Sequence, residues 1–190
     1  ANPTIPNLPP PLGEKQPNIV LVTIDTLRAD HLGCYGYARE TSKTIDKLAK
    51  EGVVFENAYA QRNSTWPSLA SIMTSMHPVS HGVRHNGLQL TSTPLTLAEV
   101  LHANGYNTAA VYTNSKGQNW EGFQVRHPVT VEPFDERATH EAVSWVKDVP
   151  TPFFLWIHYL APHSDYEPPA AFNTFVDPNY SGQIAGDKLS

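Results

Sequence analysis

The sequence is poor in cysteine, lacks a long hydrophobic run and carries no excess of positive charge. Its single cysteine, Cys34, can form neither an internal disulfide nor a cluster of thiolate ligands. No uninterrupted apolar run is long enough to predict a membrane-spanning helix. Thirteen Lys and Arg residues stand against 18 Asp and Glu residues, for a net charge of −5. The basic residues are scattered rather than aligned in a stripe, which argues against a nucleic-acid-binding protein.

The length and composition predict one α/β domain with a sizeable core. The chain has 190 residues, of which 40% are hydrophobic. Residues 1–17 are rich in Pro and Asn, so we expect a flexible linker there and the domain over residues 18–190. This linker is also typical of the mature end left by a removed signal peptide, which predicts a periplasmic or extracellular protein. A cytoplasmic protein with a flexible N-terminus is the alternative.

Apolar runs alternate along the chain with segments of helical periodicity. We expect strands at residues 19–24, 53–60, 107–112 and 153–160, and helices at residues 41–52, from 64 onward, 94–105 and 134–148. This alternation predicts a mostly parallel sheet sandwiched by helices. Binding sites in such folds form beyond the carboxyl ends of the strands, which directs attention to the residues that follow them.

Two residues in these positions are candidates for chemistry. Asp25 follows a buried apolar strand, and a carboxylate there must be paired or bound to a metal ion. Thr65 lies at the first turn of a predicted helix, where unpaired N–H groups attract anions. Its hydroxyl would need a metal ion or a base to become a nucleophile. The plainer alternatives are an ion pair or cap for Asp25 and a helix cap for Thr65.

Two further candidates lie in predicted loops. His163 follows the last apolar run and could donate to a substrate oxygen or protonate a leaving group. His158, inside that run, could equally be a hydrogen-bonded core histidine. Asn86 precedes Gly87, and Asn-Gly is first of all a turn signal. A functional Asn86 would donate its side-chain amide to an anionic oxygen.

Four segments, in order, resemble sulfatases and their relatives in the alkaline phosphatase superfamily. Residues 19–37 are similar to the opening strand and metal loop, and residues 71–83 to the helix and exit loop of the signature motif. Thr65-Trp66-Pro67-Ser68-Leu69 falls on the signature Cys/Ser-x-Pro-Ser-Arg. Residues 153–166 resemble the strand that delivers an active-site histidine.

The resemblance implies an alkaline phosphatase-like α/β fold and a role for each candidate. Asp25 would bind a divalent ion, which could be Ca²⁺, Mg²⁺, Mn²⁺ or Zn²⁺. Thr65 would contact the same ion and attack the substrate in line. His163 and Asn86 would stabilise charge on the transferred group or on the leaving group.

Several positions depart from the family pattern. Sulfatases convert the first signature residue to formylglycine, and threonine cannot form this aldehyde because its β-carbon carries a methyl group. Leu69 replaces the signature Arg, Thr26 stands where a second metal-binding Asp is common, and Lys116 is out of register with the family's Lys-x-His stretch. The sequence therefore predicts hydrolysis or transfer of phosphate mono- or diesters through a phospho-threonine, on a small-molecule or glycan ester. The alternatives are a sulfatase and a non-catalytic binding protein.

The late metal-binding motif of the superfamily is missing. Relatives carry Asp-His or Asp-Asn followed by Gly late in a longer chain, and the aspartates after His163 (Asp165, Asp177 and Asp187) lack this motif. We therefore expect an incomplete domain: a fragment, a clipped product or one half of a split protein. Such a chain should have little activity alone, and its partner would be the C-terminal remainder of its own domain.

Overall fold

The computed structural model divides into two compact units. It describes residues 16–91, 94–113, 120–164, 168–172 and 174–175. Unit 1 comprises residues 1–23 and 60–159, and unit 2 comprises residues 24–59 and 160–190. The expected linker over residues 1–17 lies almost wholly outside the described residues, as do Lys116, Asp165, Asp177 and Asp187. Those predictions remain untested.

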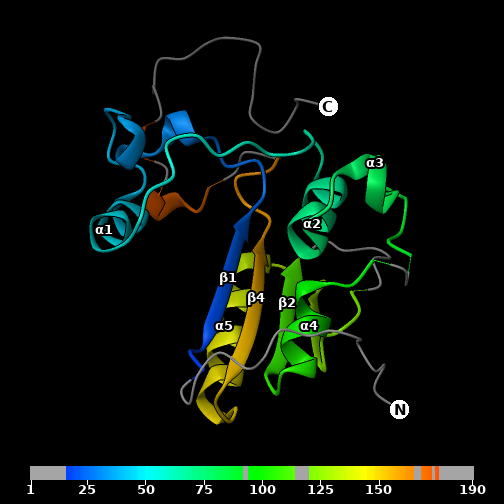
Figure 1. Cartoon of the computed structure of the whole chain (residues 1–190). Helices are drawn as coiled ribbons and strands as arrows, with labels where there is room; N and C mark the ends of the chain where they lie inside the picture. The colour runs from blue at the N-terminus through cyan, green and yellow to red at the C-terminus, as the bar shows by residue number, and fades with distance from the viewer. Residues whose placement is uncertain (1–15, 92–93, 114–119, 165–167, 173, 176–190) are drawn as a thin grey trace. The chain divides into compact units, whose positions relative to one another are not determined.

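Unit 1 is built on a four-stranded sheet. The strands are β1 (Ile19–Ile24), β2 (Asn107–Thr113), β3 (Val125–Val129) and β4 (Phe153–Tyr159), in the order β1-β4-β2-β3 (Figure 1). β2 pairs in parallel with β3 and with β4, so that Ala109 lies opposite Val125 on one side and Leu155 on the other. The expected mostly parallel sheet is confirmed.

The two central strands are the ones whose sequences are almost continuously apolar. Thr108 to Thr113 of β2 and Phe153 to His158 of β4 are all buried. Edge strand β1 behaves differently, because Val20 and Val22 are 51% and 48% exposed. A strand covered on both faces reads as an unbroken apolar run, which is why the central strands were predictable.

Helices cover both faces of the sheet, as expected (Figure 1). On one face α5 (Phe134–Asp148) buries Ala138 and Ala142 against side chains of β2 and β4. On the other face lie α2 (Thr65–Thr74) and α4 (Leu97–Ala103). Their residues share a core with the aromatic side chains of the sheet; this core contains Leu69, Met73, Ala98, Tyr112, Phe123, Phe154 and Trp156.

Helix α4 begins three residues later than the pattern from Pro94 predicted, because of a capping box. The Thr96 hydroxyl accepts a hydrogen bond from the Glu99 backbone N–H at 3.1 Å, and the Glu99 carboxylate accepts one from the Thr96 N–H at 2.8 Å. The Thr96 hydroxyl also donates to the Glu121 carbonyl at 3.0 Å. Gly122, the residue after Glu121, has φ +87°, and a Cβ on Gly122 would lie 2.6 Å from the carbonyl carbon of Ala98. Glycine allows this close approach.

One expected strand is absent, and one observed strand was not expected. Residues 53–60 form no strand, and the side chains of Val53, Phe55 and Tyr59 are 82%, 70% and 80% exposed. Strand propensity is insufficient there because the described part of unit 2 offers no sheet with which the segment could pair. Conversely, β3 was missed: its sequence mixes polar residues with Pro128, a composition tolerated at a sheet edge.

Unit 2 is organised around the Asp46 carboxylate. Its elements are the 3₁₀ turns η1 (Ala29–His31), η2 (Gly33–Tyr35) and η3 (Ala170–Phe172) and the helix α1 (Lys43–Glu51). The Asp46 carboxylate accepts hydrogen bonds from the Cys34 N–H at 2.8 Å and from the Ser42 hydroxyl at 3.0 Å. The Ser42 hydroxyl in turn accepts from the Gly33 N–H at 2.9 Å. Ser42, the N-cap residue of α1, therefore ties α1 to η2 instead of capping the helix with its side chain.

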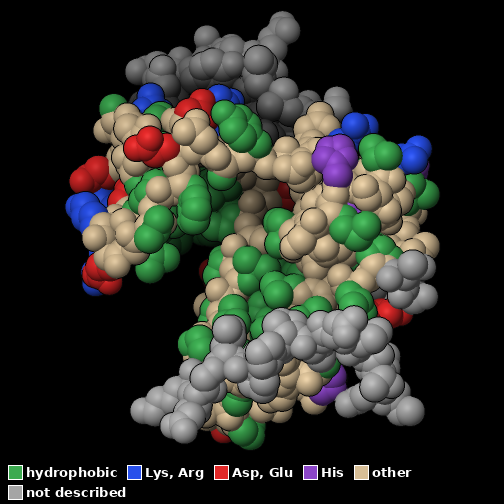
Figure 2. All heavy atoms as spheres, viewed as in Figure 1, with side chains coloured by type: hydrophobic (Ala, Val, Ile, Leu, Met, Phe, Trp, Pro, Cys, Tyr) green, Lys and Arg blue, Asp and Glu red, His purple; other side chains and the backbone are tan. Residues whose placement is uncertain are grey.

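Unit 2 also keeps hydrophobic side chains on its surface. Figure 2 shows such side chains gathered over the part of the chain around α1, and Leu48 of this helix is 69% exposed. No helix in the described ranges has the length and apolar character needed to cross a membrane.

Candidate functional site

Thr65 is the first residue of α2. Ser64 before it is extended, with φ −145° and ψ 147°, and Pro67 follows within the first turn, where its missing N–H breaks no helical hydrogen bond. The Thr65 side chain is half-buried, whereas Pro67 is buried. Thr65 therefore lies in the first turn of a helix, at the positive end of its dipole, and it is not enclosed in hydrocarbon.

Asn86 is held against this same helix terminus. Its side-chain oxygen accepts a hydrogen bond from the Trp66 backbone N–H at 3.0 Å. The turn that carries Asn86 ends at Gly87, with φ +97°, which confirms the turn indicated by Asn-Gly. Because the amide oxygen is engaged as an acceptor, the NH₂ group of Asn86 remains as a donor beside Thr65.

A buried histidine fixes the far side of α2. His81 ends the short helix α3 (Pro78–His81) and is 2% exposed. The Val83 N–H donates to its Nδ1 at 3.1 Å, so its Nε2 carries the proton and donates to the Ser71 hydroxyl at 3.0 Å. Burial lowers the pKa of His81 below its ordinary value of 6.5. A neutral His81 therefore locks α2 to the loop behind it.

His81 lies in the segment of residues 71–83 that resembles the sulfatase signature motif, but the sequence did not indicate a role for it. The available signal in the sequence was His81 directly before Gly82, since glycine commonly ends a helix, and Gly82 does cap α3. His81 contacts α2 through Ser71 rather than through Thr65, so it is a positioning residue.

Asp25 and His163 belong to unit 2, and each follows a strand, as the sequence predicted. Asp25 comes directly after β1 and is half-buried, and Thr26 beside it has φ +53°. His163 lies four residues beyond β4; its N–H donates to the Leu160 carbonyl at 2.9 Å, and its Nδ1 lies 2.9 Å from the Ser164 carbonyl. The structure thus brings Thr65 and Asn86 together within unit 1, and the pairing of Asp25 with Thr65 remains a prediction.

His158 is the hydrogen-bonded core histidine of the alternative interpretation. It is 4% exposed, and its Nδ1 lies 2.9 Å from the Thr23 hydroxyl. The same hydroxyl accepts the indole N–H of Trp156 at 3.0 Å, and the Thr113 hydroxyl donates to the His158 carbonyl at 3.3 Å. This network fixes β1 to β4 close to the strand end that precedes Asp25.

The described residues do not complete a metal site. Among them, no group of three or more His, Cys, Asp or Glu side chains is arranged to hold an ion. Asp25 offers one carboxylate, a ligand suited to hard divalent ions, and the Thr65 hydroxyl is a weaker oxygen donor.

The chain is similar to sulfatases in sequence and in structure. It is 30% identical over 151 residues to an ulvan-active sulfatase of Formosa agariphila, an alignment that covers 71% of this chain and 30% of that protein. A solved 2-O GAG sulfatase matches with a TM-score of 0.69 and 26% identity, over 80% of this chain and 36% of the other. The chain thus spans about a third of the length of these relatives.

A neighbour of different chemistry shares the fold. The phosphonate monoester hydrolase of Agrobacterium radiobacter matches with a TM-score of 0.69 over 82% of this chain and 43% of that protein. At 20% identity this likeness shows the fold alone. The sequence model of the Sulfatase family matches residues 17–187, across both units. This match covers most of the chain, and the chain belongs to the sulfatase family.

Proposed function

We propose that the protein containing this chain hydrolyses a sulfate ester of a glycan, with Thr65 as the attacking group. One observation carries the proposal: the Asn86 side chain is anchored at the α2 terminus where Thr65 lies. The positive end of a helix dipole and an amide donor beside a hydroxyl suit a tetrahedral anion under attack. The sulfate assignment rests on the family and on the two named sulfatases.

The chain's own groups have separate tasks in this proposal. The positive end of the α2 dipole and the Asn86 amide hold the anionic oxygens. The Thr65 hydroxyl oxygen forms a bond to sulfur and loses its proton to solvent water as the bond to the ester oxygen breaks. His163 gives a proton to the departing alcohol. Water then attacks the same sulfur, releases sulfate and restores the hydroxyl. Threonine has one oxygen and no second hydroxyl, so the elimination available to a formylglycine hydrate is closed to it.

A phosphate or phosphonate ester is the second candidate substrate. The observation that favours it is the identity of residue 65, since threonine cannot become formylglycine and would act on phosphorus through the same in-line attack. The fold shared with a phosphonate monoester hydrolase is compatible with it. In either case Asp25 is proposed as one ligand of a divalent ion.

The experiment compares Thr65 variants in the protein with its natural flanking sequence. Wild type, Thr65→Ala and Thr65→Ser are assayed on p-nitrophenyl sulfate and on bis-p-nitrophenyl phosphate, with Thr130→Ala, an exposed threonine of unit 1, as the matched control. We expect wild type and the control to hydrolyse the sulfate. Thr65→Ala should lose on the order of 10⁴-fold in kcat, and Thr65→Ser should keep part of it.

Each other outcome decides between the candidates. Undiminished sulfate cleavage by Thr65→Ala would exclude Thr65 as nucleophile. Turnover of the phosphodiester alone would select the second candidate. If the wild-type protein turns over neither ester and binds no divalent ion, it is a non-catalytic binding protein, the third alternative that the sequence left open.

A further inference from the structure

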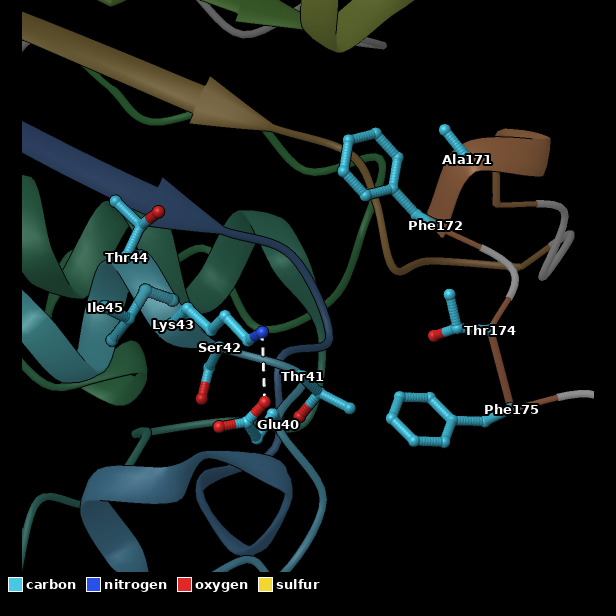
Figure 3. Close-up of a pocket in the computed structure, with 10 residues that line it drawn as sticks. All are labelled: Glu40, Thr41, Ser42, Lys43, Thr44, Ile45, Ala171, Phe172, Thr174 and Phe175. Carbon is cyan, nitrogen blue, oxygen red and sulfur yellow. Dashed lines mark ion pairs between the residues drawn. The ribbon is translucent and has the colours of Figure 1, made fainter.

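Unit 2 contains a cavity to which no function has been assigned so far. Its volume is about 600 Å³. Residues 40–45 line one side, and Ala171, Phe172, Thr174 and Phe175 line the other (Figure 3). Both segments belong to unit 2, so the cavity is a feature of this unit alone. Its volume lies within the range of about 300–1,000 Å³ that is typical of small-molecule sites.

Two aromatic rings give the cavity an apolar wall. Phe172 and Phe175 are 74% and 51% exposed, which is unusual for phenylalanine. Figure 3 shows both rings facing the 40–45 segment, with Thr174 between them. Rings held open in a concave site provide flat apolar faces against which a ligand can stack.

Charged groups surround this wall. The Arg39 guanidinium lies over the Phe175 ring, 5.3 Å from its centroid, which holds that ring in place. At the opposite side the Lys43 ammonium pairs with the Glu40 carboxylate at 3.0 Å (Figure 3). Both of those side chains are more than 70% exposed, so they can exchange their partners for a ligand at little cost.

This combination defines the chemistry of the ligand. A pyranose ring has an apolar C–H face that stacks on phenylalanine and an equator of hydroxyls that bond to carboxylate, ammonium and hydroxyl groups. Two cations against one carboxylate also favour a ligand with negative substituents. A purely apolar ligand would gain nothing from Lys43 and Glu40, and a simple anion would gain nothing from the rings.

We propose that this cavity binds a sugar ring of a sulfated glycan, with Phe172 and Phe175 as the stacking residues. The proposal rests on the proposed function, because it names the substrate class of the same protein. Phe172, Phe175 and Arg39 then determine which glycan the protein binds.

Binding is measured on a protein that cannot turn over its ligand. Thr65→Ala protein with its natural flanking sequence is titrated with sulfated disaccharides prepared from ulvan, heparin and chondroitin sulfate, and binding is followed by calorimetry and by saturation-transfer NMR. Phe172→Ala and Phe175→Ala are added singly. Phe55→Ala is the matched control, since Phe55 is 70% exposed in the same unit and does not line the cavity.

We expect at least one disaccharide to bind, and each cavity variant to weaken this binding about tenfold or more, with no change for Phe55→Ala. Phe172→Trp should restore binding, because it restores a stacking face. In the active protein the same variants should raise KM for the glycan ester and leave kcat unchanged. Absence of binding by every disaccharide, or equal binding by the cavity variants and the control, would overturn the proposal.

The failures of the two proposals are distinguishable. If wild type hydrolyses no ester but the phenylalanine variants lose glycan binding, the proposed function fails and the cavity assignment stands. If wild type hydrolyses a glycan sulfate and the phenylalanine variants match it in KM, the cavity assignment fails and the proposed function stands.

Discussion

The side-chain oxygen of Asn86 lies 3.0 Å from the backbone nitrogen of Trp66 and accepts its hydrogen bond. Asn86 therefore has two separable capacities. Its oxygen holds the turn of residues 84–87 to the start of α2, while its NH₂ group is available to an anion beside Thr65. A side chain that still accepts the Trp66 hydrogen bond but can no longer donate to an anion tests the site without destabilising the turn.

Asn86→Asp makes this separation. The carboxylate still accepts from Trp66 and suits a helix N-terminus, so the melting temperature should stay close to that of wild type. It cannot donate, and it repels an anionic ester, so kcat/KM should fall by about 10²-fold or more. Asn86→Ala removes both capacities and should also destabilise the protein by about 1 kcal/mol. Full turnover by Asn86→Asp in steady-state assays would reduce Asn86 to a structural tether.

Asp25 is tested by its effect on metal content. If Asp25 is a ligand, Asp25→Asn should lower the divalent ion bound per chain, measured by elemental analysis after dialysis, in the protein with its natural flanking sequence. The matched control is Asp30→Asn in the same unit; Asp30 is exposed, and its hydrogen bonds to Arg28 lower the pKa of its carboxyl. Equal metal content in the two variants would remove Asp25 from the ligand set.

The sequence predicted correctly those elements whose formation depends only on a local pattern of residues. The central strands β2 and β4 were predictable because burial on both faces selects nearly unbroken apolar runs. Residues 53–60 have the same β-branched and aromatic character yet form no strand, since pairing depends on a neighbour that no local pattern specifies. Edge strand β3 carries Pro128 and polar residues, so its pattern resembled a loop.

The same distinction applies to the candidate site. Thr65 at a helix start and Asp25 at a strand end followed from position in the chain, and both positions are confirmed. That Asn86 reaches Trp66 across 20 residues could not be derived from spacing, and the family resemblance indicated Asn86 only as a residue that contacts the substrate. The Ser71–His81 contact escaped notice because a buried neutral histidine resembles an exposed one in sequence.

His81 should make stability depend on pH. Because burial lowers its pKa below 6.5, the unfolded chain takes up the proton first as the pH falls. The unfolded state then binds more protons, so the free energy of unfolding decreases from about pH 6.5 down to the lowered pKa and stays reduced below it. Urea unfolding of wild type and His81→Asn, at roughly pH 7.5 and 5.5, measures this difference.

The variant should be less stable at the higher pH, because the Ser71 and Val83 contacts are altered, but its stability should change less between the two pH values. Ser71→Ala is the control, since it removes the Nε2 partner and keeps a titrating imidazole. An equal pH dependence in wild type and His81→Asn would mean that another group is responsible.

The Thr23 hydroxyl should contribute stability through the hydrogen bond that it accepts from Trp156. The Trp156 side chain is 1% exposed and donates to Thr23 at 3.0 Å, so Thr23→Val leaves a buried indole N–H without this acceptor. The expected loss is about 1–3 kcal/mol in the free energy of unfolding. Thr130→Val, at an exposed position of unit 1, should change it by less than about 0.5 kcal/mol.

A double-mutant cycle assigns this loss to the pair. Trp156→Phe removes the indole donor, so Thr23→Val should cost distinctly less in that background than in wild type. The remaining cost then belongs to the other contacts of the Thr23 hydroxyl, with His158 at 2.9 Å and with the Ile157 carbonyl at 3.4 Å. If Thr23→Val costs the same in both backgrounds, the indole hydrogen bond contributes nothing to stability, and the contribution of the Thr23 hydroxyl comes from these other contacts.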